Sequence, residues 1–170
     1  PESLMAYLDK SAVDLFENLE VFSSAELHAR CQVDMQSYTS EIQIESRTLG
    51  DMSLNHIIPT AIKYQNILIE NVQGIKEIFG TNFKTHANEQ LIILENISEH
   101  IKQINKGVAD MLFARKKANT IDDINKKALA YAKTVAPFIN QIRYHCDKLE
   151  LTVDDSIWPL AKYRELLFIR

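Results

Sequence analysis

Apolar side chains recur every three or four residues along most of this chain, and this spacing restricts its fold more than any other feature. The clearest stretch is formed by Leu91, Leu94, Ile97, Ile101, Ile104, Val108 and Met111. Similar stretches occupy residues 27–49, 54–79 and 121–149. Only four glycines and four prolines occur in 170 residues, which disfavours the turn-rich β-sandwiches and barrels. We therefore predict an all-α fold.

The N-terminal residues predict one or two short helices between Ser3 and Glu20, with Ser3 and Ser11 as candidate caps. Ser23 stands three residues before Glu26, which is the spacing of a capping box. In this motif each side chain accepts a hydrogen bond from the other residue's backbone N–H. A long helix is expected to begin there and to reach about residue 49.

Three positions are expected to interrupt or perturb the later helices. Gly50 is predicted to end or bend the first long helix. Pro59 and Pro137 should kink any helix already running through them, because proline lacks an N–H and crowds the preceding turn. Thr120 and Asp123 repeat the capping-box spacing with a shorter acid, before the last long helix.

Helices of about thirty residues extend roughly 45 Å each, at 1.5 Å per residue. Joined by short connections such as the polar stretch 80–88, they should pack antiparallel. We predict an elongated antiparallel bundle of three to four long helices, preceded by one or two short ones. A chain of 170 residues that is 46% hydrophobic suits one helical domain over residues 1–170.

The overall composition excludes several classes of protein. A net charge of −4, with acidic and basic residues interspersed, gives no broad basic surface for nucleic acid. Two cysteines, Cys31 and Cys146, cannot form a disulfide framework, and no signal-like stretch opens the chain, so we expect a cytoplasmic protein. No apolar run reaches the roughly eighteen residues of a membrane span, so no membrane partner is expected.

The search for chemistry gives mainly negative results. The four glycines are isolated, which excludes a phosphate-binding loop, and the nucleophile-elbow, zinc-helix and di-metal carboxylate motifs are absent. Only His28 with Cys31, and His145 beside Cys146, resemble a metal-ligand pair. A metal site and a phosphotransfer histidine therefore remain weak hypotheses. We predict no catalytic, cofactor-binding or metal-binding residue.

Two charged clusters have simple structural interpretations. Glu41 and Glu45 lie one helical turn apart, within possible reach of Arg30 and Arg47, and suit a solvated or ion-paired helix face better than an acid–base pair. The basic residues 115–117 suit the negative end of a helix dipole. Neither cluster requires a ligand.

Large apolar residues gather near the end of the chain. They suit either packing back onto the bundle or docking against another domain or subunit, and the sequence leaves both open. The predicted interface comprises Trp158, Leu160, Tyr163, Leu166, Leu167 and Phe168.

Particular strings carry a family resemblance. They are AELHARCQVDMQSYTSEIQIE at 25–45, NHIIPTAIKYQN at 55–66, RYHCDKLE at 143–150 and WPLAKYRELLF at 158–168. Together they resemble the C-terminal region of type III glutamine synthetases, and the opening PESLMAYLDKSAVDLF is similar to a more widely shared glutamine synthetase ending. By this resemblance residues 1–49 correspond to the end of the catalytic domain, and residues 50–170 to a type III-specific helical region.

The resemblance implies a parent enzyme that joins ammonia to glutamate with ATP and a divalent metal such as Mg²⁺, in sites formed between neighbouring subunits. It also implies that the ligands for these groups precede this chain. The leading hypothesis is therefore a non-catalytic assembly domain that packs on the catalytic core and on neighbouring subunits of a homo-oligomer. The alternative is a regulatory module that binds a metabolite or a partner, with Glu45, Gln65, His100 and Gln141 as candidate lining residues.

Overall fold

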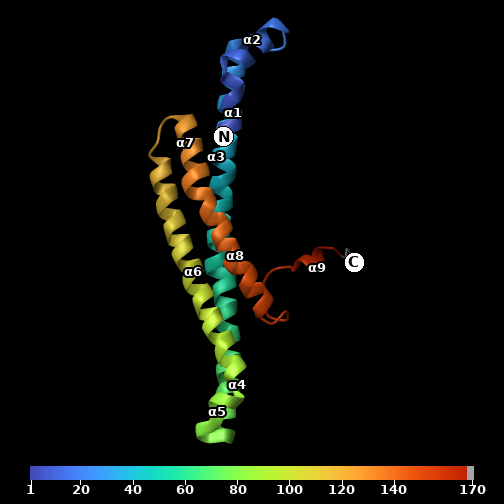
Figure 1. Cartoon of the computed structure of the whole chain (residues 1–170), viewed down its shortest axis with the longest axis vertical. Coiled ribbons are helices and arrows are strands. Elements are labelled where there is room, and N and C mark those ends of the chain that lie inside the picture. The colour runs from blue at the N-terminus through green and yellow to red at the C-terminus, as the bar shows by residue number, and fades with distance from the viewer. Residues whose placement is uncertain (168–170) are drawn as a thin grey trace. The chain divides into compact units, whose positions relative to one another are not determined.

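The computed structural model describes residues 1–167, and every regular element in this range is helical (Figure 1). The longer helices are α3 (Ser24–Met52), α4 (Ile58–Phe79), α6 (Asn88–Asn119) and α8 (Ala136–Thr152). The shorter ones are α1 (Glu2–Met5), α2 (Lys10–Asn18), α5 (Phe83–His86), α7 (Ile124–Ala130) and α9 (Tyr163–Leu166). Single 3₁₀ turns occupy Ala6–Leu8 and Gly80–Asn82. The all-α prediction is confirmed, including two short N-terminal helices.

Two π-helical turns join consecutive helices without a break in the helical backbone. Ser53–Ile57 links α3 to α4, and Tyr131–Val135 links α7 to α8. In each turn the N–H of the residue that follows donates to the carbonyl of the turn's first residue, five positions earlier. Each proline lies immediately beyond such a turn, with Pro59 and Pro137 as the second residues of α4 and α8. The helix therefore widens ahead of each proline.

The two glycines that border the α3–α4 region behave differently. Gly50 is buried inside α3, so of the two predicted outcomes, an end or a bend of the helix at this residue, the end does not occur. A glycine costs helix stability but does not forbid the helical conformation. Gly80 instead follows the end of α4 with a φ of 55°, a conformation that side-chain-bearing residues adopt rarely.

The predicted cap before α3 is present, whereas the predicted caps of the two N-terminal helices are not. The Ser23 N–H donates to Glu26 Oε2 over 2.8 Å, and the Glu26 N–H lies 3.4 Å from Ser23 Oγ, so the capping box before α3 is confirmed. The prediction that Ser3 and Ser11 cap helices is wrong, because they lie inside α1 and α2.

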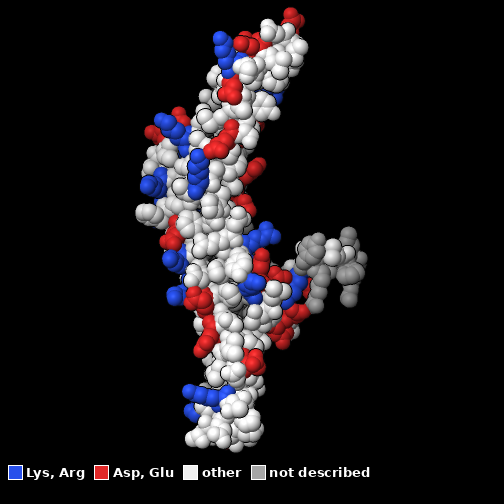
Figure 2. Space-filling model, in the orientation of Figure 1, with Lys and Arg blue, Asp and Glu red and all other residues white. Residues whose placement is uncertain are grey.

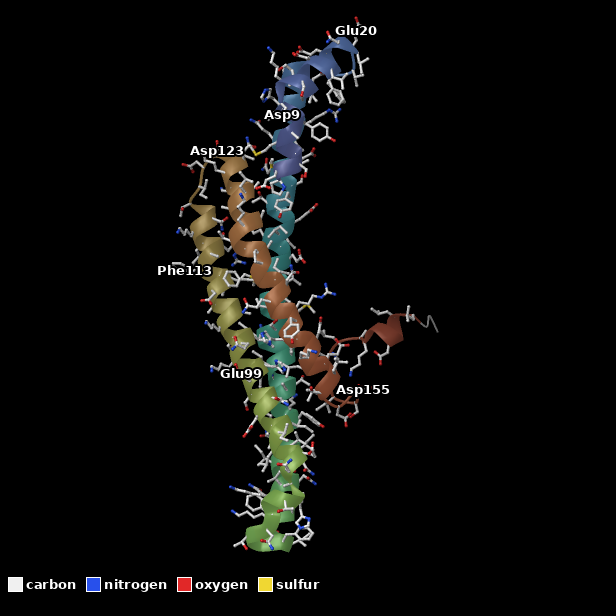
Figure 3. The ribbon with its side chains drawn as sticks, viewed as in Figure 1. Asp9, Glu20, Glu99, Phe113, Asp123 and Asp155 are labelled. Atoms are coloured by element: carbon white, nitrogen blue, oxygen red, sulfur yellow. The ribbon has the colours of Figure 1, made fainter. Side chains whose placement is uncertain are left out.

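Thr120 and Asp123 serve two different helices. Thr120 Oγ1 donates to the Lys117 carbonyl at the end of α6, whereas Asp123 Oδ1 accepts from the Lys126 N–H over 2.7 Å and caps α7 (Figure 3). The prediction of a reciprocal box between them is therefore wrong.

The chain divides into two compact units, and the helices α3, α6 and α8 each contribute residues to both. The first unit comprises Pro1–Thr48 and Ala109–Asn140. Its core contains Cys31, Met35 and Ala128, against which Leu4 and Leu8 pack from the N-terminal segment. Other buried side chains of this unit are Leu27, Met111, Ala118, Tyr131, Val135 and Ile139.

The second unit comprises Leu49–Val108 and the chain from Gln141 onward. Gln65 on α4 donates to Ser98 on α6, and Gln90 donates to Asn71, so these two helices run antiparallel. Ile142 on α8 lies beside Gly107 on α6. The buried side chains of the unit are Ile57, Ile58, Ala61, Leu68, Ala87, Ile97, Ile104, Val108, Ile142, Cys146, Leu149 and Val153.

Candidate interaction surface

The C-terminal segment, residues 154–167, follows the last turn of α8 and belongs to the second unit. Of its predicted interface residues, Trp158 and Leu160 are half-buried, whereas Leu166 and Leu167 are 67% and 61% exposed. The side chain of Tyr163 and the whole of Phe168 lie outside the described residues. The described part of the predicted interface is therefore apolar and accessible toward its end.

Polar contacts fix the start of this segment to α8. Lys162 Nζ donates to the Glu150 carbonyl over 2.8 Å and also contacts the Asp155 carboxylate, near the turn seen in Figure 3. The Ser156 N–H donates to Asp154 Oδ1, and hydrogen bonding by Ser156 lowers the pKa of that carboxyl. These contacts hold the start of the segment against α8, and the exposed Leu166 and Leu167 follow it.

The N-terminal segment, residues 1–22, shows the largest mismatch between composition and burial. It contains ten large apolar or aromatic residues: Leu4, Met5, Tyr7, Leu8, Val13, Leu15, Phe16, Leu19, Val21 and Phe22. None of them is buried, and Tyr7, Leu15 and Leu19 are 49%, 55% and 62% exposed. Exposed apolar area costs about 25 cal/mol per Å², so a segment of this composition gains much from a covering partner.

The same segment is nevertheless held in place. The Ser24 N–H donates to Glu17 Oε1 over 2.8 Å, and Lys133 Nζ lies 2.8 Å from Glu2 Oε1. The turn between α2 and α3 places Glu20 at a φ of 53° (Figure 3). The apolar side chains are therefore displayed on an anchored element of the first unit.

A pocket of about 180 Å³ lies between the N-terminal segment and the start of α3, within the first unit. Its wall includes the aromatic rings of Tyr7, Phe16 and Phe22, whose neighbouring centroids lie 6.3 and 5.9 Å apart. The Arg30 guanidinium stacks over the Phe22 ring at 4.4 Å. The remaining lining residues are Leu4, Leu27, Cys31 and Asp34. The pocket is smaller than the roughly 300–1,000 Å³ of typical small-molecule sites.

The two suggested metal pairs do not form metal sites. His28 is exposed while Cys31 is buried beneath Leu4, whose carbonyl accepts from its Sγ. Cys146 lies 3.6 Å from Ser53 Oγ, whereas the His145 ring turns to a different neighbour. Within residues 1–167, no group of three His, Cys, Asp or Glu side chains gathers as metal ligands would.

Burial raises the pKa of both thiols, Cys31 and Cys146. A protonated thiol is a poor nucleophile and a poor metal ligand, because the thiolate is the reactive form. These cysteines act as small apolar core residues.

The charged clusters of the sequence lie on helix surfaces. Glu41, Glu45 and Arg47 are exposed on α3, and the fully buried residue next to Glu45 is Ser46. The exposure of Glu41 and Glu45 agrees with their interpretation as part of a solvated helix face. Figure 2 shows acidic and basic side chains mixed along the displayed face rather than gathered into one basic patch.

The candidate lining residues of a regulatory pocket have separate surroundings. Gln65 binds Ser98 on the neighbouring helix, and Glu45 and Gln141 are exposed. His100 meets His145, a contact between residues 45 positions apart that sequence spacing could not reveal. Among the described helices, none has both the length and the apolar character that crossing a membrane requires.

Comparison with known proteins finds similar sequences among glutamine synthetases. Residues 1–76 match the family model described as the glutamine synthetase C-terminal domain. A glutamine synthetase of Bacteroides fragilis (strain YCH46) is 43% identical over 171 aligned positions, which cover 100% of this chain and 24% of that protein. The chain is homologous to glutamine synthetase. A type-3 glutamine synthetase of Dictyostelium discoideum is 26% identical over 100% of this chain and 23% of its own length. A glutamine synthetase of Butyrivibrio fibrisolvens is 20% identical over 99% of this chain and 24% of its own length. This homologue of glutamine synthetase therefore spans about a quarter of the length of the curated relatives it matches.

Proposed function

We propose that this chain is the non-catalytic C-terminal helical domain of a type III glutamine synthetase, a cytoplasmic ATP-dependent ligase that forms glutamine from glutamate and ammonia. Residues 1–49 would close the catalytic domain and residues 50–170 would add a helical region to it. ATP and Mg²⁺ would bind elsewhere in the parent enzyme. No motif of this chain resembles the residues that hold them. The role of the domain would be to pack on the catalytic core and on neighbouring subunits.

The observation that supports this proposal is that the N-terminal segment is rich in apolar side chains but buries none of them fully. Its ten large apolar residues are anchored in place, yet none is buried within this chain. Interfaces between permanently associated subunits resemble a domain core cut in half, with apolar residues at their centre. Residues 1–22 have the composition of such a half-core.

The pocket beside this segment supports a protein partner rather than a metabolite. Its volume of about 180 Å³ and its walls of Tyr7, Phe16 and Phe22 suit one inserted apolar side chain. The guanidinium of Arg30, stacked over Phe22, adds a charged group to the pocket lining. A docking anchor from the catalytic core fits this description better than a nucleotide does.

The experiment uses the full-length parent chain, with Leu15→Ser and Leu19→Ser introduced together. Both side chains are more than half exposed, so the substitution leaves the core of this domain intact. We expect loss of the assembled species in light scattering and loss of glutamine formation, because the apolar contact is replaced by hydroxyls. Ile78→Ser is the matched control, since Ile78 is 76% exposed on α4 outside both segments.

The predicted C-terminal interface is tested in parallel with Leu166→Ser and Leu167→Ser. These substitutions spare Lys162, which fixes the start of the segment, and the half-buried Trp158. Assembly that survives both pairs of substitutions, with a mass equal to that of the Ile78→Ser control, would refute the docking role. Loss with one pair only would assign the docking to that segment.

A further inference from the structure

Two histidine side chains meet across the α6–α8 contact of the second unit. His100 Nδ1 and His145 Nδ1 lie 3.0 Å apart, and the ring centroids are separated by 5.2 Å with an interplanar angle of 49°. Both side chains are half-buried. A separation of 3.0 Å is a hydrogen-bond distance, so one ring must donate from Nδ1–H while the other accepts at Nδ1.

The hydrogen bond between the two rings depends on how many protons the pair carries. In the neutral pair the two rings are complementary tautomers, one protonated at Nδ1 and the other at Nε2. Addition of one proton gives an imidazolium that still donates to the neutral ring. Addition of a second proton leaves two Nδ1–H groups and two positive charges facing one another, and the hydrogen bond is lost.

The surroundings of His100 oppose its protonation. Lys148 lies 5.4 Å above the Tyr144 ring, which packs edge-on against His145 at 5.1 Å. Burial is the main cause that lowers the pKa of His100, and the charges of His145 and Lys148 lower it further. Glu99 opposes them, but its carboxylate is exposed and also accepts from Gln103 over 2.7 Å (Figure 3).

The charged groups that act on His100 therefore come from both helices. Glu99 lies on α6, while His145 and Lys148 lie on α8. The balance favours the neutral form of His100, because Lys148 is cationic and His145 becomes cationic when it is protonated.

We propose that His100 and His145 form a proton-sensitive clamp between α6 and α8, closed at neutral pH and opened when both rings are protonated. This inference is independent of the proposed assembly role. The clamp lies on the half of α8 that carries Cys146 and Leu149 into the core of the second unit. Opening it would loosen the part of α8 from which the C-terminal segment departs.

The sign of the effect follows from the number of protons bound in each state. In the unfolded chain each histidine titrates near its ordinary pKa of about 6.5. The folded His100 accepts its proton at lower pH, so the unfolded state binds more protons and stability decreases as the pH falls below about 6.5. One suppressed proton raises the unfolding constant by up to about tenfold between about pH 7.5 and pH 5.5.

Nitrogen-15 NMR of the imidazoles in the 170-residue chain tests the clamp directly. We expect one of the two residues as the Nδ1–H tautomer and the other as the Nε2–H tautomer at neutral pH. Their titrations should be coupled, with the second proton binding well below the ordinary histidine pKa of about 6.5. Two independent titrations near the ordinary pKa of about 6.5 would overturn the proposal.

Urea unfolding at the two pH values supplies the second readout. The unfolding constant of the unaltered chain should rise more on acidification than that of His100→Gln, while the matched control His28→Gln should behave as the unaltered chain does. Equal pH dependence in all three would refute the clamp. If His100→Gln fails to fold, His145→Gln replaces it, and the NMR titration needs no variant. Micromolar Zn²⁺ that shifts both imidazoles at neutral pH would identify a metal chelate and overturn the proposal.

Discussion

Gly107 and Gly74 offer a matched test of the α6–α8 packing. Both glycines lie inside long helices of the second unit, on α6 and α4 respectively. A Cβ built on Gly107 would lie 2.9 Å from Ile142 Cγ1 and 3.7 Å from its Cδ1, whereas a Cβ on Gly74 meets nothing within 4 Å. The two sites therefore share the same gain in helix propensity and differ in steric overlap.

The magnitudes follow from these two terms. Replacement of glycine by alanine inside a helix stabilises it by roughly 0.5–1 kcal/mol. We expect this gain at Gly74. At Gly107 the new methyl group overlaps Ile142 well inside the optimal carbon–carbon separation of about 3.5–4.0 Å, and overpacking of this kind costs about 1–3 kcal/mol. The net effect of Gly107→Ala is thus a loss of up to about 2 kcal/mol.

Urea denaturation followed by circular dichroism measures both variants. The difference between Gly74→Ala and Gly107→Ala isolates the overlap term, which should be about 1–3 kcal/mol. A double-mutant cycle with Ile142→Ala removes the offending Cγ1, and in that background Gly107→Ala should stabilise as Gly74→Ala does. If Gly107→Ala is as stabilising as Gly74→Ala in the unaltered background, the packing described for α6 and α8 is wrong.

Two further substitutions test individual hydrogen bonds by the same denaturation assay. Asp123→Ala removes the side-chain cap of α7 and should lower the unfolding free energy by about 0.5–2 kcal/mol, whereas Asp122→Ala, at an exposed neighbour outside the helix, should be nearly neutral. Tyr131→Phe removes the 2.7 Å bond from the buried Tyr131 hydroxyl to Asn119 Oδ1 and should cost about 0.5–1.5 kcal/mol. An unfolding free energy unchanged by either substitution would contradict the role assigned to that bond.

The features that the sequence predicted correctly depend on neighbouring residues. The capping box of Ser23 and Glu26 needs only three-residue spacing, and the structure contains it. The apolar period along α6 likewise identifies Ile97, Ile104 and Met111 as core residues. Both patterns follow from the geometry of a single helix.

The errors arise where tertiary packing selects among local possibilities. Gly50 can end a helix or continue it, and here it is buried within α3. Thr120 and Asp123 have the spacing of a box, yet one ends α6 and the other begins α7. The buried face of α3 also includes the polar residue Ser46, which is fully buried although the apolar periodicity does not mark it as a core position.

The histidine pair was beyond sequence reasoning for a related reason. His100 and His145 are separated by 45 residues and lie on different helices. Each alone is an ordinary polar residue on a half-buried helix face. Their chemistry appears only when α6 and α8 pack in the observed register, which a one-residue shift of either helix would abolish.

The two prolines, Pro59 and Pro137, show that a local sequence rule can predict where a helix changes without predicting the form of the change. Proline must disturb the preceding turn, because it has no N–H for the carbonyl four residues earlier and its ring crowds that carbonyl. A kink and a π-helical turn both relieve this conflict, so the sequence predicts where the helix changes and not how. In the structure the N–H of Ile58 reaches Ser53, and the N–H of Ala136 reaches Tyr131, one residue before each proline. Since the two sites lie in different units with different neighbours, the shared response belongs to proline itself rather than to the packing around it.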